Sequence, residues 1–385
     1  MSMKATTVTR SYYPALDGLR GFAILGVLLQ HNFSFLPVPR FGWVGVDLFF
    51  VLSGFLITDI LLKTKEQKNF LPNFYIRRML RIFPLYYGSL ILFFSLAPLI
   101  SQFKDQYSYY SANQGMLWMH LQNWLYIAKP KLDNHTVFSH FWSLSVEEQF
   151  YLVWPLMILG CNKAKRLVVL IYVALLGSIL FRFTTWSYLG NGDTNFLLQY
   201  MTRIDGLCVG SLIAVWRTNS EQAGTKKVVR LGITFISLHA VAFIASKTIF
   251  PGVPHFTIFG YSTIAVCFGL LLNFLMEKRN RLTKFLFENR PIKGLGKISY
   301  GVYIYHWPIF VLFKVFVADR ILQMGLLENI IISIGATSLA VLVSTLSYNL
   351  FERKILALRD VLTTENLVKR LRQKLLPLYK SASIK

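Results

Sequence analysis

LDGLRGFAILGVLLQHNFSF, residues 16–35, is an apolar run long enough to cross a membrane as one helix, yet it contains Arg20 and His31. Ionisable side chains inside a membrane span are costly unless they face a protein interior or a wet cavity, so each marks a candidate functional site. Eleven helical steps of about 100° bring the two residues to nearly the same face, and about 1.5 Å per step separates them by about 16 Å. One wall of one cavity is therefore predicted to carry a cation near one membrane surface and an imidazole near the other.

The composition of the whole chain indicates a membrane protein. Of 385 residues, 54% are hydrophobic and only 15% are charged, and the mean hydropathy is +0.47. The sequence therefore predicts an all-α, polytopic membrane protein with about ten transmembrane helices. The net charge of +23 does not indicate a nucleic-acid partner, because the basic residues fall between apolar spans rather than on one soluble face.

Ten apolar segments are predicted to cross the membrane, with the bilayer as their partner: 16–35, 43–62, 83–101, 143–160, 167–185, 196–216, 229–249, 256–276, 297–317 and 329–351. A shorter apolar piece, 115–128, contains His120, Gln122 and Asn123, and is predicted to be interfacial or re-entrant.

The distribution of Lys and Arg predicts the orientation of these spans. With ten crossings, nearly all basic residues between spans fall on one side, and the other side holds only Arg40, Lys104, Lys129, Lys131 and Arg320. The positive-inside rule then places both termini in the cytoplasm. Residues 1–352 form the predicted transmembrane domain, and residues 353–385 form a short basic cytoplasmic tail.

The outer ends of the first two predicted spans carry His31 and Asp47 at a similar depth, and the hairpin between the spans places them level. A carboxylate that accepts an imidazole N–H fixes the tautomer and leaves the other ring nitrogen as a base. This pattern predicts His31 as a catalytic base with Asp47 as its orienting partner. The alternative is a polar pair that only holds two helices together.

Glu147 and Glu148 begin the fourth predicted span at a similar depth. Adjacent residues on a helix point about 100° apart, so only one of them is expected to enter the site, and spacing does not decide which. Either is a candidate catalytic residue, as a partner for His31 or an anchor for an acceptor hydroxyl. The alternative is a capping carboxylate in the first helical turn.

An arginine cluster precedes the third predicted span on the cytoplasmic side, at Arg77, Arg78 and Arg81. Arg78 and Arg81 share a helix face, and with Arg20 nearby they would present guanidinium groups suited to phosphate oxygens. The cluster is therefore predicted to bind an anionic ligand. The alternative is ordinary positive-inside anchoring.

Two further groups are candidate substrate-binding residues. Ser299, Tyr303 and His306 form a polar stripe on one face of the ninth predicted span, which suggests the lining of a shared cavity, with a packing role as the alternative. Arg203 and Asp205 lie two steps apart on a helix, so they are not expected to pair with each other. Each needs a partner on another helix, and for Arg203 one of the glutamates is a candidate.

No metal site is predicted, because none of the candidate His, Asp and Glu residues shows the i, i+4 ligand spacing of an HExxH helix. Ser–His–Asp chemistry is also disfavoured, since there is no nucleophile-elbow sequence and Ser53 is flanked by apolar residues.

Taken together, these strings resemble the acyltransferase-3 family of multispan membrane O-acyltransferases. In chain order they are LDGLRGFAILGVLLQH with its R-x10-H, GWVGVDLFFVLSGFLI, RRMLRIFPLYY with its R-x-x-R, HFWSLSVEEQFYLVWP, TRIDGLCVG and SYGVYIYHWPI. Six ordered motifs make the resemblance specific, and the family's ten spans with a cytoplasmic N-terminus agree with the orientation given by the basic residues.

The resemblance implies transfer of an acyl group, usually acetyl from acetyl-CoA, to a hydroxyl of a sugar, cell-surface polysaccharide or small natural product. By motif, Arg20 and His31 are the R-x10-H pair, Arg78 and Arg81 the R-x-x-R pair, and Glu147 or Glu148 the acidic element. We expect CoA phosphates at the inner arginines, the pantetheine arm along the Arg20 to His31 wall, and His31 as the general base. An acyl-enzyme route stays open. Acyl-CoA is expected as a substrate, with no tightly bound cofactor.

Some members of the family carry a C-terminal extracytoplasmic SGNH domain, which residues 352–385 are too few to form. The expected protein is thus a stand-alone member in the plasma (inner) membrane that acts directly or with a separate extracytoplasmic transferase as partner. The alternative function is a proton-coupled secondary transporter or lipid-linked glycan flippase, although no inverted repeat is visible. A structural scaffold does not explain so many ionisable groups inside the spans.

Overall fold

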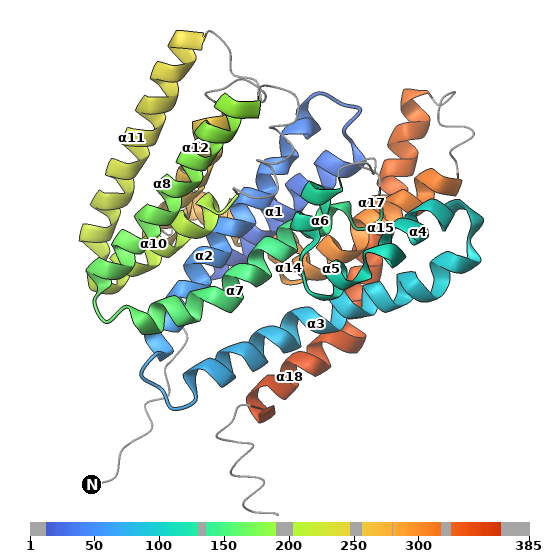
Figure 1. Ribbon diagram of the computed structural model, residues 1–385, viewed down its shortest axis with the longest axis horizontal. Helices are drawn as coiled ribbons and strands as arrows, with labels where there is room; N and C mark the ends of the chain where they lie inside the picture. Colours follow the sequence, from blue (N-terminus) through green and yellow to red (C-terminus); the bar gives the residue numbers. More distant parts are fainter. Residues whose placement is uncertain are drawn as a thin grey trace, which may run out of the picture.

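The fold is built from helices (Figure 1). In a computed structural model of the protein, residues 13–129, 136–189, 203–246, 256–278, 280–316 and 325–362 are described, and all regular elements within these ranges are helical. The all-α prediction is confirmed for them.

A helix overlaps each of the ten predicted spans. These helices are α1 (Pro14–Asn32), α2 (Val44–Thr64), α3 (Phe70–Leu96), α7 (Trp142–Gly160), α8 (Ala164–Leu189), α10 (Asp205–Asn219), α11 (Glu221–Ser246), α12 (Tyr261–Glu277), α15 (Ser299–Phe316) and α17 (Leu326–Ser347). The part of the sixth predicted span before residue 203 lies outside the described residues.

Five helical segments in the described ranges are long and apolar enough to cross a membrane: Phe41–Thr64, Phe70–Leu99, Ala164–Ser187, Ile258–Glu277 and Leu326–Arg359. They mark a multi-pass membrane protein by length and composition. The number ten stays a prediction.

The piece at 115–128 does not form one long helix. It folds into α5 (Gln114–Trp118) and α6 (Gln122–Ala128), which follow α4 (Lys104–Ala112). At five and seven residues, α5 and α6 are too short to cross a membrane. Side chains of α7 hold this piece in place, since Gln149 donates to the backbone carbonyl of His120 and Ser145 donates to Gln122.

Helix α3 begins 13 residues before the predicted span 83–101, at Phe70. The helix is longer than the predicted span because the arginines lower the hydropathy of its first part without interrupting the helical pattern of buried residues, among them Phe74, Ile82 and Leu85. Helix α3 packs against α18 (Arg353–Leu362), which continues from α17 through the π-helix η6 (Tyr348–Glu352). The first part of the predicted tail is therefore helical and packed, and residues 363–385 lie outside the described residues.

Glycines allow α2 and α10 to lie in direct backbone contact. A Cβ atom at Gly54 would lie 2.2 Å from the carbonyl oxygen of Leu207, and one at Gly210 would lie 2.1 Å from that of Val51. Small residues at a helix interface permit this close approach in membrane proteins. This contact joins α2 to the group of α8, α10, α11 and α12.

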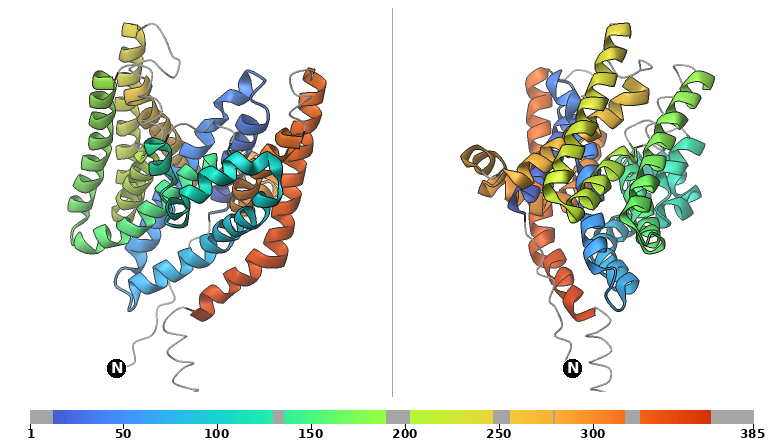
Figure 2. Two further views of the ribbon diagram at one scale, coloured as in Figure 1. Left: turned by 45° about the vertical axis from the view of Figure 1, so that its right-hand side comes forward. Right: turned by 90° about the vertical axis from the view of Figure 1, so that its left-hand side faces the viewer.

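Helix α1 carries Arg20 and His31, and its N-terminal half is fixed by α14 (Arg290–Lys297). A Cβ atom at Gly296 would lie 1.8 Å from the carbonyl oxygen of Asp17. Helix α1 also contacts α2 and α15. Figure 2 shows α8 and α11 on one side of the molecule and α17 on the other, with α1 between them. Arg20 and His31 therefore project from a central, well-packed helix.

Candidate functional site

A cavity of about 680 Å³ lies where α1, α2, α3, α7 and α15 meet. Seven of the predicted site residues line it: Arg20, Arg78, Arg81, Glu147, Glu148, Ser299 and Tyr303. They come from segments far apart in the sequence, and the fold brings them to one polar space between apolar helices.

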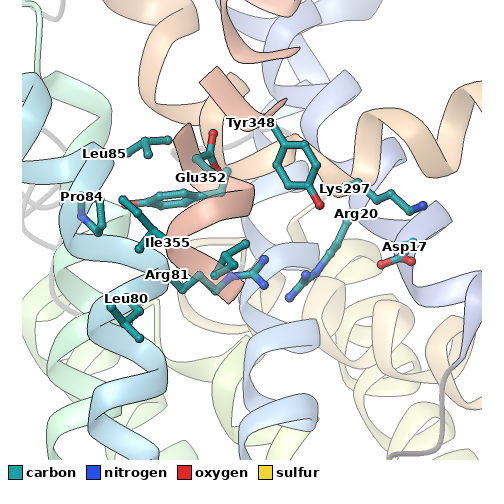
Figure 3. Close-up of a pocket in the computed structure, with 12 residues that line it drawn as sticks. Asp17, Arg20, Leu80, Arg81, Pro84, Leu85, Lys297, Tyr348, Glu352 and Ile355 are labelled. Carbon is teal, nitrogen blue, oxygen red and sulfur yellow. The ribbon is translucent and has the colours of Figure 1, made fainter. Parts of the chain in front are cut away.

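A second cavity of about 640 Å³ adjoins the first and shares Arg20, Arg81 and Tyr300 with it. Figure 3 shows the guanidinium groups of Arg20 and Arg81 facing each other from α1 and α3, with Lys297 on the far side of Arg20. The carboxylates of Asp17 and Glu352 line the same cavity, so three cationic side chains and two anionic ones meet there and leave a net positive charge. This cationic pocket is therefore suited to phosphate oxygens, as the spacing of the arginines predicts.

His31 pairs with another histidine. Its Nδ1 lies 2.8 Å from Nε2 of His306 on α15, and the two ring planes are within 2° of parallel. The Nδ1 of His306 lies 3.0 Å and 2.9 Å from the backbone carbonyl oxygens of Val302 and Tyr303.

These contacts fix the tautomers of both rings. Carbonyl oxygens only accept, so Nδ1 of His306 carries its hydrogen and Nε2 is the acceptor. His31 then donates from Nδ1, and its Nε2 keeps a free lone pair. No hydrogen bond to that nitrogen is found among the described residues, which makes His31 a base oriented by its neighbour.

The dyad of His31 and His306 is enclosed by aromatic side chains. The ring of Trp307 lies 4.7 Å from that of His31, and Trp307 Nε1 donates to the backbone carbonyl of Thr136. The hydroxyl of Tyr303, which also lines the cavity, donates to the backbone carbonyl of His140. Tyr303 thus connects the cavity wall to the dyad.

The prediction that Asp47 orients His31 is wrong. The Asp47 carboxylate is held by Arg203, with distances of 3.0 Å from Nε and 2.5 Å from Nη2. Both side chains are only 4% exposed. Asp47 of α2 faces the turn that precedes α10, where the buried guanidinium of Arg203 offers two donors.

Arg203 and Asp205 do not pair with each other, as expected, and neither lines either of the two cavities described above. Arg203 binds Asp47 rather than a glutamate, and its guanidinium lies 4.2 Å from the ring of Tyr261. Asp205 binds Arg182 of α8, a fully buried side chain. Both residues are used in ion pairs between helices, and their substrate-binding roles stay a prediction.

Both glutamates line the cavity, so the expectation that only one enters is wrong. Glu147 turns toward α2, where it accepts a hydrogen bond of 2.7 Å from Ser53. Glu148 lines the cavity together with Arg78 and Arg81 of α3. The cavity is wide enough around α7 to include two directions about 100° apart.

Of the three predicted arginines, Arg77 is placed differently from the others. It is exposed and lines neither cavity, whereas Arg78 and Arg81 both line the first. Arg78 lies one helical turn from buried Phe74 and so faces the protein, and Arg77 points about 100° away. The predicted ligand-binding role of Arg77 is not supported by this position.

Sequence reasoning missed several polar residues of the site. Tyr151 donates to Ser53 across 3.1 Å, so the apolar neighbours of Ser53 in the sequence conceal a polar contact in the fold. His140 packs its ring 5.1 Å from that of His306. The sequence could have indicated His140 as a site residue by its position, since it lies seven residues before Glu147, in the turn that precedes the same helix. Among the described residues, no group of three or more His, Cys, Asp or Glu side chains is arranged to hold a metal ion.

A histidine pair, a polar cavity and a cationic pocket lie within one helical membrane domain. The chain belongs to the acyltransferase-3 family, since the family model described as an acyltransferase domain matches residues 13–349.

Curated relatives support this membership. The chain is 31% identical over 338 residues to the peptidoglycan O-acetyltransferase OatA of Listeria monocytogenes, with 80% of this chain and 51% of the relative covered. It is 28% identical over 317 residues to the O-acetyltransferase OatA of Staphylococcus aureus, covering 78% of this chain and 51% of the relative. A putative peptidoglycan O-acetyltransferase, YrhL of Bacillus subtilis, is 29% identical over 321 residues, covering 78% and 49%. The chain thus spans about half the length of these relatives. No solved structure matches it significantly.

Proposed function

We propose that the protein transfers an acetyl group from cytoplasmic acetyl-CoA to a hydroxyl of a cell-surface glycan. The observation that carries the proposal is the arrangement of α1, which holds a base with a free nitrogen at His31 and also holds Arg20 beside Arg81 in the cationic pocket. An anionic donor bound at one end and a base at the other are the two requirements of acyl transfer from CoA. The names of the relatives point to peptidoglycan as the acceptor.

The proposed orientation follows from the basic residues. Ten spans with both termini in the cytoplasm put the cationic pocket toward the inner surface of the plasma membrane, where CoA is found. The cavity lined by Ser53, Glu147 and Tyr303 then offers hydroxyl and carboxylate partners for the amide groups of the pantetheine arm. The dyad lies toward the outer surface, where a glycan acceptor is available.

In the proposed reaction His31 acts as the general base. Its Nε2 takes the proton of the acceptor hydroxyl while that oxygen bonds to the thioester carbonyl carbon. The carbon–sulfur bond then breaks, and the CoA thiolate takes the proton back from the His31 imidazolium. His306 keeps His31 in the productive tautomer throughout, because its own Nδ1 hydrogen is held by backbone carbonyls.

The test uses the full chain in nanodiscs with radiolabelled acetyl-CoA and soluble peptidoglycan fragments. We expect label in the acceptor and free CoA thiol with the wild type, and neither with His31→Ala, although calorimetry should show that His31→Ala still binds CoA. Release of CoA thiol also reports transfer to an acceptor other than the fragments supplied. Intact acetyl-CoA under all conditions, together with no CoA binding, would contradict the proposal and favour a proton-coupled transporter.

A further inference from the structure

Between α12 and α15 the chain forms two short helices that lie outside the five long apolar segments. They are α13 (Arg281–Phe287) and α14 (Arg290–Lys297), and at seven and eight residues both are too short to cross a membrane. In the right-hand view of Figure 2 this segment, coloured tan, extends sideways from the helix bundle. Its length therefore suits the surface of a membrane rather than its interior.

Hydrogen bonds of two asparagines fix the corner between α13 and α14. Asn280 begins α13 with a capping box, in which its side chain accepts from the backbone N–H of Thr283 and the Thr283 hydroxyl accepts from the backbone N–H of Asn280. The side-chain oxygen of Asn289 accepts from a backbone N–H of α14, and its amide donates to the carbonyl oxygens of Phe285 and Leu286. These bonds satisfy backbone groups at the helix ends, so α13 has a defined orientation relative to α14.

One side of this corner packs against the N-terminal half of α1. A Cβ atom at Gly18 would lie 1.9 Å from the carbonyl oxygen of Phe287, whose ring lies 5.1 Å from that of Phe22. Phe22 belongs to an exposed apolar stripe of α1 that continues with Leu25 and Leu29. Since lipid tails are as apolar as these side chains, an exposed apolar stripe on a membrane helix faces lipid. Helix α13 is therefore attached to α1 beside its lipid-facing stripe.

Another side of α13 exposes a second apolar surface. Leu282, Phe285 and Leu286 are 63%, 73% and 39% exposed. Their i, i+3, i+4 spacing places them on one face of the helix. This face adjoins Phe287, which contacts Phe22, so the apolar surface of α13 continues that of α1. A contiguous exposed apolar surface of this kind marks an interaction site.

Basic side chains run beside the apolar face. Arg281 and Lys284 are exposed. Each directly precedes an apolar residue of the face, Leu282 or Phe285, so the basic stripe is turned about 100° from the apolar one. Residues 277–297 as a whole contain seven Lys and Arg against two Glu. A positively charged helix with a separate apolar face is typical of helices that lie on an anionic bilayer.

We propose that α13 is a membrane-surface helix that binds anionic phospholipid headgroups of the cytoplasmic leaflet. Its apolar face enters the lipid beside the stripe of α1, while Arg281 and Lys284 bind phosphate oxygens. The basic residues favour lipid over a second protein as the occupant, because they match the charge of anionic headgroups. The bound leaflet holds α14, and with it Lys297 of the cationic pocket, at a fixed depth. The surface lies outside both cavities, so its role is independent of the proposed function.

A fluorescent probe on α13 tests whether this helix enters the lipid. Phe285→Cys is labelled with a nitrobenzoxadiazole maleimide in a full-length chain that carries Cys161→Ala and Cys267→Ala and retains Cys208, which is buried. Glu66→Cys, in the exposed turn after α2, is the matched control. In nanodiscs that hold one chain each, the probe on α13 should emit at shorter wavelength than the control. Nitroxide-labelled phosphatidylglycerol should remove most of its fluorescence and leave the control bright.

The selectivity for anionic lipid is tested with charge-neutralising variants. Native mass spectrometry with added phosphatidylglycerol or phosphatidylcholine gives an apparent Kd for each lipid, and Tm is the control for folding. Arg281→Gln with Lys284→Gln should raise the Kd for phosphatidylglycerol about tenfold or more and leave that for phosphatidylcholine unchanged. Lys163→Gln with Lys165→Gln removes the same charge from exposed positions at the start of α8 and should leave both values within about threefold.

Three results would overturn the inference. A probe on α13 that emits like the control and is not quenched would place the helix in water. A probe that emits at shorter wavelength but is not quenched by the nitroxide lipid would place it against protein. Equal changes in the Kd for phosphatidylglycerol in the two double variants would indicate a general effect of charge and no site at α13. The transfer assay with the wild type tests the proposed function separately from all three.

Discussion

His31 and His306 are 275 positions apart in the sequence, and their rings form a coplanar pair with a 2.8 Å contact between Nδ1 and Nε2. In many hydrolases a carboxylate orients the catalytic imidazole. Here the neutral imidazole of His306 orients His31, and the tautomer of His306 is fixed by backbone carbonyls of its own helix. Orientation is thereby achieved without burying another charge beside the base.

The dyad gives the first prediction. His306→Ala should lower kcat by about 10²-fold or more, because His31 loses the acceptor that holds its tautomer. His306→Gln should retain much more activity, since its carbonyl oxygen can accept from Nδ1 of His31. Steady-state rates of CoA release measure both, with Tm as the control for folding. Equal losses in the two variants would contradict the orienting role.

The ion pair of Asp47 and Arg203 is predicted to be structural. Asp47→Ala leaves a buried guanidinium uncompensated and should cost about 3–5 kcal/mol of stability. The double variant Asp47→Leu with Arg203→Met should recover most of the Tm, because apolar pairs of similar size often replace buried ion pairs without loss. Thermal unfolding in detergent measures this. An Asp47→Ala protein of normal Tm but no activity would instead assign Asp47 to the chemistry.

Arg77 and Arg78 form a matched pair for anion binding at the first cavity, which Arg78 lines and Arg77 does not. Arg78→Ala should raise the Kd for CoA by about 10–100-fold, as expected for a lost charge-assisted hydrogen bond of about 1.5–3 kcal/mol. Arg77→Ala removes the same charge from an exposed position and should leave the Kd within about threefold. Isothermal titration of CoA at two salt concentrations separates a direct contact from a general effect of charge. Equal changes in both variants would indicate anchoring alone.

The close contact between α2 and α10 predicts that alanine at Gly210 and alanine at Gly177 affect stability very differently. Gly210→Ala places a methyl group against the Val51 carbonyl and should destabilise the protein or prevent its folding. Gly177→Ala in α8 meets no other atom within 4 Å and should be neutral or stabilising, by up to about 1 kcal/mol from helix propensity. Expression yield and Tm measure both. Two variants of equal Tm would argue against direct packing of α2 on α10.

The positions of helices and the faces of individual helices could be predicted from the sequence. Apolar runs located a helix in each predicted span, and the 3.6-residue period brought Ser299 and Tyr303 to one wall of the cavity. Periodicity within one helix does not specify how that helix is rotated against its neighbours. The partner of Asp47 was therefore predicted wrongly, and the pairing of Asp205 with Arg182 was not foreseen.

The position of Arg20 and His31 on a single helix has a consequence for donor selection. The backbone hydrogen bonds of α1 set their separation at about 16 Å, so it does not depend on a loop or a hinge. In the proposed reaction the helix therefore fixes the distance that the donor must span between its phosphates, bound at Arg20, and its thioester, placed at His31. A short thioester without the nucleotide should be a poor substrate however reactive it is, and the length of the carrier arm, rather than the chemistry of the acyl group alone, sets which donors react.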